Sequence, residues 1–317
     1  MNLTHLAIGA ARWYNGKVCA GRARDILFPE ARMDIRLVAV DLDGTLLKND
    51  RTLSPHTVLA VERAIRHGVE VAFATGRSLC ELRELLDQLP AVRYAVTCTG
   101  AQVLDCRAAR VLADAPLSAA KVRLVRERLG KLDVLLEVYQ GGRVWVDAAQ
   151  YLRIGEFEAA CGNPTLRHTR TPRPNLDPWL ATQSRPVTKV HMYFLTTADR
   201  DAALDALEDL PMTVCTSSPL DVEVMARGVD KGTGLACLAR HLDLEPEQIL
   251  AVGDSGNDLA MLTYAGVCAV MANGDADLLS MADIIADTNE HDGVARLLDS
   301  LLSGTLEAPR PTGLPLQ

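Results

Sequence analysis

The sequence lacks the features that mark membrane-spanning, nucleic-acid-binding and thiolate-metal proteins. No window approaches the ~18 consecutive apolar residues of a membrane helix, and no signal-like apolar stretch follows the N-terminus, so membrane insertion and secretion are disfavoured. The 41 Asp and Glu exceed the 33 Lys and Arg, and the net charge of −8 disfavours a nucleic-acid partner. None of the eight cysteines forms a Cys-x-x-Cys pair, so we expect reduced core thiols in a cytoplasmic protein.

The composition is that of a folded protein with two domains. The chain has 317 residues, about twice the length of a typical domain, and one large domain is the alternative. Hydrophobic residues make up 48% and charged residues 23%, which excludes a disordered chain. Residues 1–32 show no periodicity, so we interpret them as a disordered leader or a mis-assigned start, with Met33 as the alternative first residue. Residues 303–317, which hold three prolines, are predicted to form a flexible tail.

Strands and helices alternate in the two outer parts of the chain. The first part predicts strands over 35–40, 69–75 and 94–99, with helices over 54–68 and 79–89 between them. After Lys231 the pattern resumes with strands over 249–252 and 267–271 and helices over 235–241, 258–265 and 294–302. Because β-α-β units build parallel sheets, we expect an α/β, Rossmann-like core domain formed by 33–114 and 227–302.

The intervening segment, 115–226, has a different pattern. Strands are predicted over 134–139 and 143–146 around Gly141-Gly142, which is a hairpin signal, and further strands over 187–195, 213–215 and 222–225 accompany one helix over 198–207. Residues 162–186 contain five prolines and are predicted to be mostly loop. The shift indicates an α+β domain inserted into the α/β domain.

Two aspartates directly follow the first predicted strand. They belong to the segment Asp41-Leu42-Asp43-Gly44-Thr45. Because side chains alternate along a strand, both carboxylates are expected at its carboxyl end, where open α/β sheets bind ligands. Neighbouring carboxylates are costly unless a cation or a shared proton relieves them. The alternative is an acidic turn without a chemical role.

A second acidic cluster follows the predicted strand over 249–252. It reads Gly253-Asp254-Ser255-Gly256-Asn257-Asp258. Its glycines allow a tight turn, and Asn257 and Asp258 lie one helical turn beyond Asp254. Oxygen ligands of this kind suit Mg²⁺. The alternative is a capped helix start that uses Asp254 or Ser255.

Thr75-Gly76 and Lys231 complete a candidate phosphate site. Thr75-Gly76 joins a predicted strand to a predicted helix, where a hydroxyl and backbone N–H groups favour anions. Lys231 opens another predicted helix and is one of only six lysines beside 27 arginines, although a solvated lysine is the alternative for this residue alone. The fragment 232–234 lacks the third glycine of a dinucleotide loop, so we discount it.

These four segments, in this order, resemble the haloacid dehalogenase-like (HAD) superfamily and in particular its Cof-type phosphatases. The resemblance covers roughly residues 35–302 and rests on motifs at 41–45, Thr75-Gly76-Arg77, Lys231 and 253–258. Lys231 lies 156 positions after Thr75, and in Cof-type members a cap domain is inserted at this place. The resemblance therefore implies that 115–226 is the cap.

The resemblance implies a Mg²⁺-dependent phosphatase that hydrolyses a small phosphate monoester, either a sugar phosphate or a phosphorylated cofactor. Asp41 is implied to be the nucleophile that forms an aspartyl-phosphate, and Asp43 the general acid. The metal is implied to bind the carboxylates of Asp41 and Asp254 and the backbone carbonyl of Asp43.

Further side chains are implied to hold the phosphoryl group. They are Thr75, Gly76, Lys231 and Asn257. Asp258, with Asn257, is implied to orient Lys231 and the groups around the metal. One departure from the Cof-type pattern is Thr99, in Thr99-Gly100-Ala101, where an asparagine is usual. This exchange puts a polar contact near the substrate in doubt, and we expect altered specificity from it.

The predicted cap holds two further groups of interest. Its seven aromatic residues either stack on a substrate ring or, as we favour, pack within the protein: Tyr139, Trp145, Tyr151, Phe157, Trp179, Tyr193 and Phe194. Its basic stretch either approaches an anionic substrate or, as we favour, forms a solvated loop: Arg167, His168, Arg170 and Arg173.

Three other functions stay open at this point. A phosphomutase and a sucrose-phosphate-type phosphatase are built on a similar cap, and a regulatory protein that binds a phosphorylated ligand without turnover would keep the fold. The paired carboxylates argue against the regulatory protein, since without turnover nothing would favour two such groups side by side. The sequence carries no assembly signature, so it predicts no oligomeric state.

Overall fold

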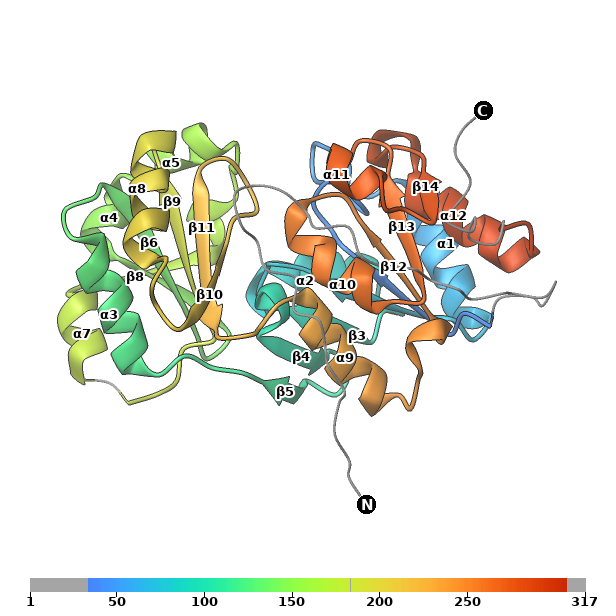
Figure 1. Ribbon diagram of the computed structural model, residues 1–317, viewed down its shortest axis with the longest axis horizontal. Helices are drawn as coiled ribbons and strands as arrows, with labels where there is room; N and C mark the ends of the chain where they lie inside the picture. Colours follow the sequence, from blue (N-terminus) through green and yellow to red (C-terminus); the bar gives the residue numbers. More distant parts are fainter. Residues whose placement is uncertain (1–33, 183, 307–317) are drawn as a thin grey trace, which may run out of the picture.

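The computed structural model describes residues 34–182 and 184–306. Within these residues two β-sheets, each with its own helices, form two lobes side by side (Figure 1). The first sheet has the order β14-β13-β12-β1-β2-β3-β4-β5, and the second has the order β10-β11-β9-β6-β7-β8. The predictions for residues 1–32 and for 307–317 lie outside the described residues.

The first sheet is parallel over six strands: β1 (Leu37–Val40), β2 (Glu70–Ala74), β3 (Tyr94–Thr97), β12 (Ile249–Gly253), β13 (Val267–Met271) and β14 (Ile284–Ala286). Two antiparallel strands that the sequence patterns did not predict, β4 (Gln102–Asp105) and β5 (Arg110–Asp114), extend it at one edge. The sheet is the Rossmann-like core that the alternating pattern predicts.

Helices cover both faces of this core sheet, because successive strand residues are buried in opposite directions. In β1, Val38 and Val40 pack with α1 (Pro55–Arg66), α2 (Leu79–Gln88) and α12 (Gly293–Ser303). Leu37 and Ala39 pack with α9 (Lys231–His241), α10 (Leu259–Tyr264) and α11 (Ala276–Leu279) on the other face. The predicted α/β class is confirmed.

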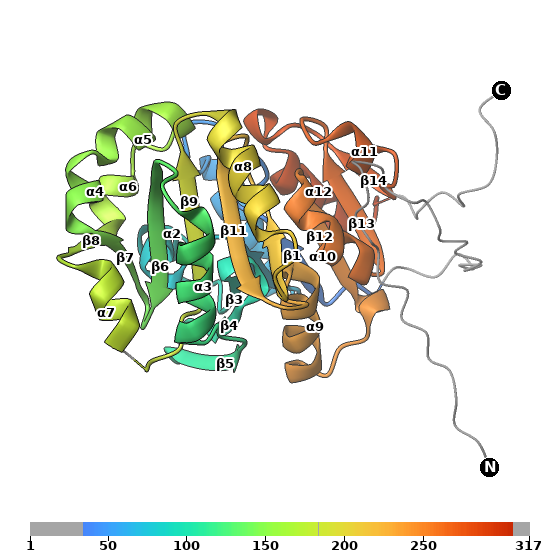
Figure 2. The same ribbon diagram turned by 60° about the vertical axis from the view of Figure 1, so that its left-hand side comes forward.

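The second sheet belongs to the inserted segment. Its strands are β6 (Val134–Gln140), β7 (Arg143–Asp147), β8 (Arg170–Arg173), β9 (Lys189–Phe194), β10 (Met212–Cys215) and β11 (Asp221–Ala226). One face packs against α3 (Ala119–Leu129), α7 (Leu176–Thr182) and α8 (Thr197–Leu207). Helices α4 (Ala148–Leu152), α5 (Ile154–Cys161) and α6 (Leu166–Thr169) lie beside these strands (Figure 2).

The prediction of a loop over 162–186 is wrong, since α6, β8 and α7 lie in this range. Two of its prolines occupy positions where a missing N–H costs little. Pro172 lies in β8, which is an edge strand of the second sheet, and Pro178 lies in the first turn of α7. Proline content therefore did not distinguish these short elements from a loop.

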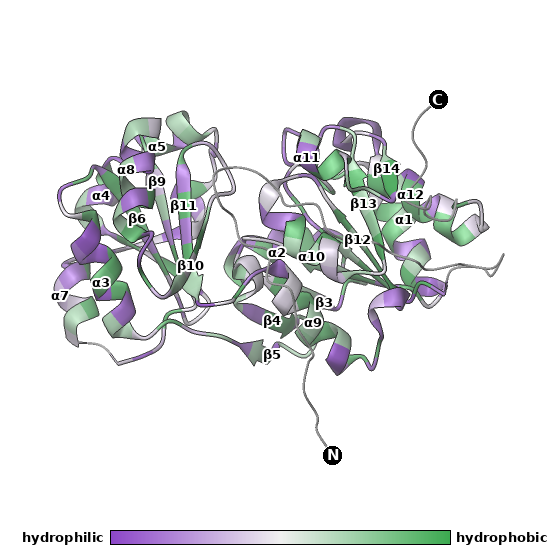
Figure 3. Cartoon of the chain, in the orientation of Figure 1, coloured by the Kyte–Doolittle hydropathy of each residue, from purple (hydrophilic) through white to green (hydrophobic). Residues whose placement is uncertain are grey.

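Strands β12 and β13 of the core sheet are hydrophobic, whereas β11 of the second sheet also carries hydrophilic residues (Figure 3).

The cysteines of the described residues are free thiols, and burial raises the pKa of Cys98 to about 12 and that of Cys106 to about 11. None of the helices in the described ranges has both the length and the apolar character that a bilayer span requires.

Candidate active site

The predicted motifs meet at one edge of the core sheet. Asp41 follows β1, Thr75 follows β2 and Asp254 follows β12, and these three strands are parallel neighbours. Lys231 joins them from the first turn of α9, whose start is capped by the Asp230 side chain accepting a hydrogen bond from the Thr233 N–H at 2.7 Å.

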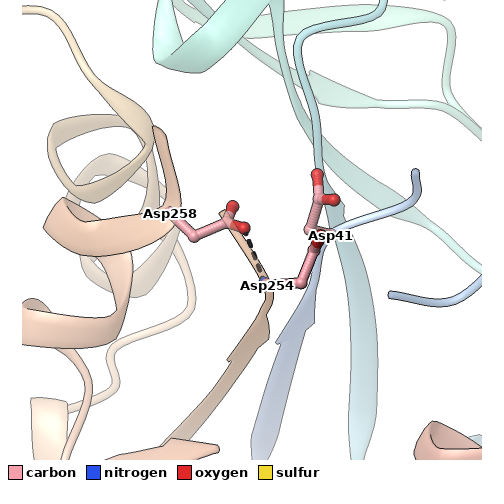
Figure 4. Close-up of side chains that lie close together, drawn as sticks. All are labelled: Asp41, Asp254 and Asp258. Carbon is pink, nitrogen blue, oxygen red and sulfur yellow. Dashed lines mark hydrogen bonds between the residues drawn. The ribbon is translucent and has the colours of Figure 1, made fainter. Parts of the chain in front are cut away.

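Three carboxylates form the centre of the site. One oxygen each from Asp41, Asp254 and Asp258 lies within 4.8 Å of the others (Figure 4). Burial raises the pKa of Asp41, and the nearby carboxylates of Asp258 and Asp254 raise it further against the opposing effect of Lys231. Burial and Asp258 likewise raise the pKa of Asp254 to about 7. This concentration of negative charge is what a divalent cation would relieve.

Lys231 is buried between two of these carboxylates, so the alternative of a solvated lysine is wrong. Its Nζ donates to Asp41 Oδ1 and to Asp258 Oδ1, each at 2.6 Å, and its side chain is 1% exposed. Although burial lowers the pKa of Lys231, Asp258 and Asp41 raise it above its ordinary value, so the ammonium stays charged.

Asp258 is fully engaged within the protein. Its Oδ2 accepts hydrogen bonds from the N–H groups of Asp254 at 3.0 Å and Ser255 at 3.1 Å, while Oδ1 binds Lys231. Asp254 Oδ1 accepts a hydrogen bond from the Thr45 hydroxyl at 2.7 Å, whereas Asp254 Oδ2 accepts none from the described residues. Asp41 and Asp254, and not Asp258, are therefore the carboxylates suited to a metal ion.

Asp43 has a partner that the sequence patterns did not identify. Arg77 binds its carboxylate twice, Nε to Oδ2 at 2.9 Å and Nη2 to Oδ1 at 2.5 Å. Although desolvation in the cleft raises the pKa of Asp43, the Arg77 guanidinium lowers it below its ordinary value. The position of Arg77 directly after Thr75-Gly76 was the available signal.

The segment 75–77 is fixed by a hydrogen bond within it and by the turn that follows β3. The Arg77 N–H donates to Thr75 Oγ1 at 3.1 Å, and the Thr75 carbonyl accepts from the Thr99 N–H at 3.0 Å. The Gly76 N–H makes no hydrogen bond with any described residue. A hydroxyl and a free N–H at this place are suited to phosphoryl oxygens.

A cavity of about 1120 Å³ opens from these residues toward the second sheet. Asp41, Asp43, Thr75, Gly76 and Asn257 line its core side. Its opposite wall comes from alternate residues of β9 and β11 and their surroundings: Tyr139, Lys189, His191, Tyr193, Ser217, Asp221 and Glu223. The cavity is large enough for a small phosphorylated metabolite.

The sequence of residues 38–298 matches the family model of the haloacid dehalogenase-like hydrolases. The chain belongs to this family. The relatives found include two Bacillus subtilis phosphatases of 5-amino-6-(5-phospho-D-ribitylamino)uracil. YcsE is 28% identical over 84% of this chain and 95% of its own length, and YitU is 30% identical over 84% and 97%.

Solved structures agree on the fold. A haloacid dehalogenase-like hydrolase from B. subtilis superposes with a TM-score of 0.74 at 24% identity, covering 84% of this chain and 99% of its own. The resemblance to Cof-type phosphatases is confirmed, and with it the assignment of this HAD-family chain as a phosphatase, which is a phosphoric monoester hydrolase.

One residue that braces this HAD site went unnoticed in the sequence. Asn273 Nδ2 donates to the carbonyl of Gly44 at 2.8 Å, and Asn273 Oδ1 accepts from the Asn289 N–H at 3.0 Å. Asn273 therefore ties the turn after Asp43 to the segment that follows the edge strand β14. Asn257, by contrast, makes no hydrogen bond with Lys231 within the described part of the chain; its Oδ1 accepts from the Ser255 hydroxyl at 3.2 Å.

The aromatic residues of the inserted segment divide as the packing interpretation expects for most of them. Tyr139 and Tyr193 line the cavity. The other five are not among its lining residues and pack into hydrophobic clusters: Trp145, Tyr151, Phe157, Trp179 and Phe194.

The interpretation of the basic stretch as a solvated loop is wrong for two of its members. Arg170 is buried, with Nε bound to Glu137 at 2.5 Å and Nη1 bound to Glu81 of α2 at 2.6 Å. Arg173 stacks over the Trp179 ring at 4.3 Å. His168 does line the cavity. Sequence alone did not show that carboxylates on other elements neutralise Arg170.

Proposed function

We propose that this HAD-family phosphatase is Mg²⁺-dependent and hydrolyses a small phosphate monoester through an aspartyl-phosphate. The observation that carries the proposal is the buried Asp41 carboxylate, bound by Lys231 at 2.6 Å and adjacent to Asp254 at the floor of a large cavity. The named activities of YcsE and YitU, both acting on a phosphorylated ribitylaminouracil, support a sugar phosphate or a phosphorylated cofactor as the substrate.

In the first step, a carboxylate oxygen of Asp41 forms a bond to phosphorus while the bond from phosphorus to the leaving oxygen breaks. Asp43, in its protonated form, gives its proton to that leaving oxygen. In the second step, Asp43 accepts a proton from water, the water oxygen attacks phosphorus, and inorganic phosphate and the free Asp41 carboxylate result. Splitting the transfer in this way lets one aspartate serve as acid and then as base.

The donor set fits Mg²⁺, which prefers a few carboxylate and carbonyl oxygens together with water and substrate oxygens. Asp41 and Asp254 would hold it with the backbone carbonyl of Asp43, because Asp258 is occupied by Lys231 and two N–H groups. Bound there, the ion would offset the negative charge of the phosphoryl group and of both carboxylates.

The remaining residues would hold the phosphoryl oxygens. The Lys231 ammonium, the Thr75 hydroxyl and the Gly76 N–H are donors of the right kind, and Asn257 contributes an amide from the turn after β12 on the same side of the cavity. Asp258 orients Lys231 and the Asp254 loop. We propose that residues 33–114 and 227–302 are the catalytic core and that 115–226 is the cap, which closes the cavity and excludes water.

The test is phosphate release from a panel of monoesters, including p-nitrophenyl phosphate, with and without Mg²⁺, for the native protein and for Asp41→Asn. We expect metal-dependent release that falls by several orders of magnitude in the variant. Release that survives Asp41→Asn would exclude an aspartyl-phosphate, and transfer of the phosphoryl group to an isomer without free phosphate would identify a mutase.

A further inference from the structure

The cap contacts the phosphate-binding segment directly through Lys189 of β9. Lys189 Nζ donates to the Gly76 carbonyl at 2.7 Å and to Glu223 Oε1 of β11 at 3.0 Å, and the two side chains are 1% and 2% exposed. Glu223 Oε2 in turn accepts the hydroxyl of Thr99, which belongs to the core. A buried ion pair of the cap is thus attached to two backbone segments of the core.

The contact to the Gly76 carbonyl fixes more than one atom. The peptide unit between Gly76 and Arg77 is planar, so the direction of its carbonyl determines the direction of the Arg77 N–H. That N–H donates to Thr75 Oγ1 at 3.1 Å. Because an N–H occupies an acceptor position of the hydroxyl, the hydroxyl hydrogen of Thr75 is left to donate to a phosphoryl oxygen.

A side chain at Gly76 would crowd the same contact. A Cβ at this position would lie 3.1 Å from Glu223 Oε1, 3.4 Å from Thr99 Oγ1 and 3.6 Å from Lys189 Nζ. The ion pair therefore packs directly against the backbone of the phosphate-binding segment. A shift of the cap by even a fraction of an ångström would change this contact.

We propose that Lys189 is a positioning residue for phosphoryl transfer. Held by Glu223, which in turn accepts the Thr99 hydroxyl, Lys189 orients the peptide unit from Gly76 to Arg77 and, through it, the Thr75 hydroxyl. The phosphate site is therefore complete only while the cap is docked. The inference rests on the proposed function, since it assumes that Thr75 and Gly76 bind the phosphoryl group.

The direct test is a double-mutant cycle on kcat/KM. Lys189→Met with Glu223→Gln removes both charges together, because an unpaired buried charge would destabilise the cap. Thr75→Val removes the hydroxyl. A displacement of about 1 Å in a reacting site costs about 100-fold, so we expect each change to lower kcat/KM by roughly 10- to 100-fold. Since both act through one hydroxyl, the combined variant should be at most about threefold worse than the poorer single one.

A second measurement separates positioning from contact with the leaving group, because Lys189 also lines the cavity. If Lys189 acts on the phosphoryl site, the Lys189→Met/Glu223→Gln variant loses the same factor with p-nitrophenyl phosphate and with an alkyl phosphate. A loss that depends on the leaving group, or losses that multiply with Thr75→Val, would overturn the proposal.

The controls distinguish cap docking in general from this contact. Asn163→Ala removes another bond between cap and core, the one from Arg51 Nη1 at 2.5 Å, which does not involve Gly76. Because Asn163 also lines the cavity, this control uses the small substrate p-nitrophenyl phosphate, for which we expect kcat/KM within about twofold of the native value. Thr99→Val keeps both charges and removes only the hydroxyl that donates to Glu223, so this variant tests the contact if the charge-free variant fails to fold. We expect a three- to tenfold loss of kcat/KM, and an unchanged kcat/KM would count against the proposal.

If Asp41→Asn abolishes release but the Lys189 variants leave it unchanged, the inference fails and the proposed function stands. A native protein that releases no phosphate overturns both.

Discussion

Arg77 donates two hydrogen bonds to the carboxylate of Asp43, from Nε to Oδ2 at 2.9 Å and from Nη2 to Oδ1 at 2.5 Å. This bidentate geometry suits a charged carboxylate. A general acid must carry a proton, so the proposed role of Asp43 requires this pair to open when a substrate enters. While the pair is closed, Arg77 keeps the Asp43 carboxylate in its charged form.

Asp43→Asn should separate the two chemical steps. With p-nitrophenyl phosphate, whose leaving group needs no proton, the first step should proceed and the second, which needs a base, should slow by about 10²–10⁴-fold. We expect a burst of about one p-nitrophenolate per active site followed by slow turnover, measured by rapid mixing. Arg77→Met keeps the carboxyl group and should show no burst. A linear time course for Asp43→Asn at high enzyme concentration would contradict the proposed double role.

Asp254→Ala should weaken metal binding. Its carboxylate is the one that keeps an oxygen available beside Asp41, since Asp258 is fully bonded. Loss of one of two carboxylate ligands should raise the Mg²⁺ concentration for half-maximal activity by tenfold or more. The exposed Asp277, on nearby α11, supplies the control Asp277→Asn, which should leave the titration unchanged. Equal titrations for Asp254→Ala and the native protein would remove Asp254 from the ligand set.

The stability of the cap should depend on pH through His191. Although burial lowers the pKa of this imidazole, the carboxylates of Asp221 and Glu137, at 3.5 and 3.6 Å, raise it to about 9. Glu223 lies at 3.9 Å, and Lys189 opposes the shift.

The sign follows from comparing folded and unfolded states. Because the folded pKa exceeds the ordinary value near 6.5, the stabilisation is complete below about pH 6.5 and is lost as pH rises to about 9. We expect the melting temperature to fall over this range, and His191→Gln to flatten the fall. His67→Gln, at an exposed position, should keep the native profile. A native profile that is flat from pH 6.5 to 9 would exclude a protonated His191.

The sequence predicted the parts of this molecule that are encoded locally. Asp41, Thr75 and Asp254 each follow a strand of the same parallel sheet, so strand order alone brings them together. The contact of Lys189 with the Gly76 carbonyl, and the pair of Arg170 and Glu81, join residues of cap and core that are far apart in the chain. No pattern within 115–226 shows which of its charges face the core, because this depends on how the two sheets dock. The residues of 115–226 that line the cavity could therefore be identified only from the structure.

Thr99, which stands where Cof-type members usually carry asparagine, has a backbone cost that can be measured. Its φ of 57° and ψ of 37° lie in the left-handed region, which costs a β-branched residue roughly 1–2 kcal/mol and which asparagine tolerates far better. Its hydroxyl nevertheless supplies the buried contact to Glu223.

Thr99→Asn should relieve the backbone while its amide N–H replaces the hydroxyl as a donor to Glu223. We expect the free energy of unfolding to rise by about 1 kcal/mol, which raises the melting temperature by a few degrees, while kcat/KM is retained. Thr99→Val keeps the branched side chain and loses the donor, so it should melt below the native protein because Glu223 is left with an unsatisfied oxygen. Thermal melting of the three proteins at one pH is the measurement. If Thr99→Asn melts lower than Thr99→Val, the left-handed backbone of residue 99 is not what limits stability. The packing around Gly76 and Glu223 would then leave no room for a side chain longer than that of threonine.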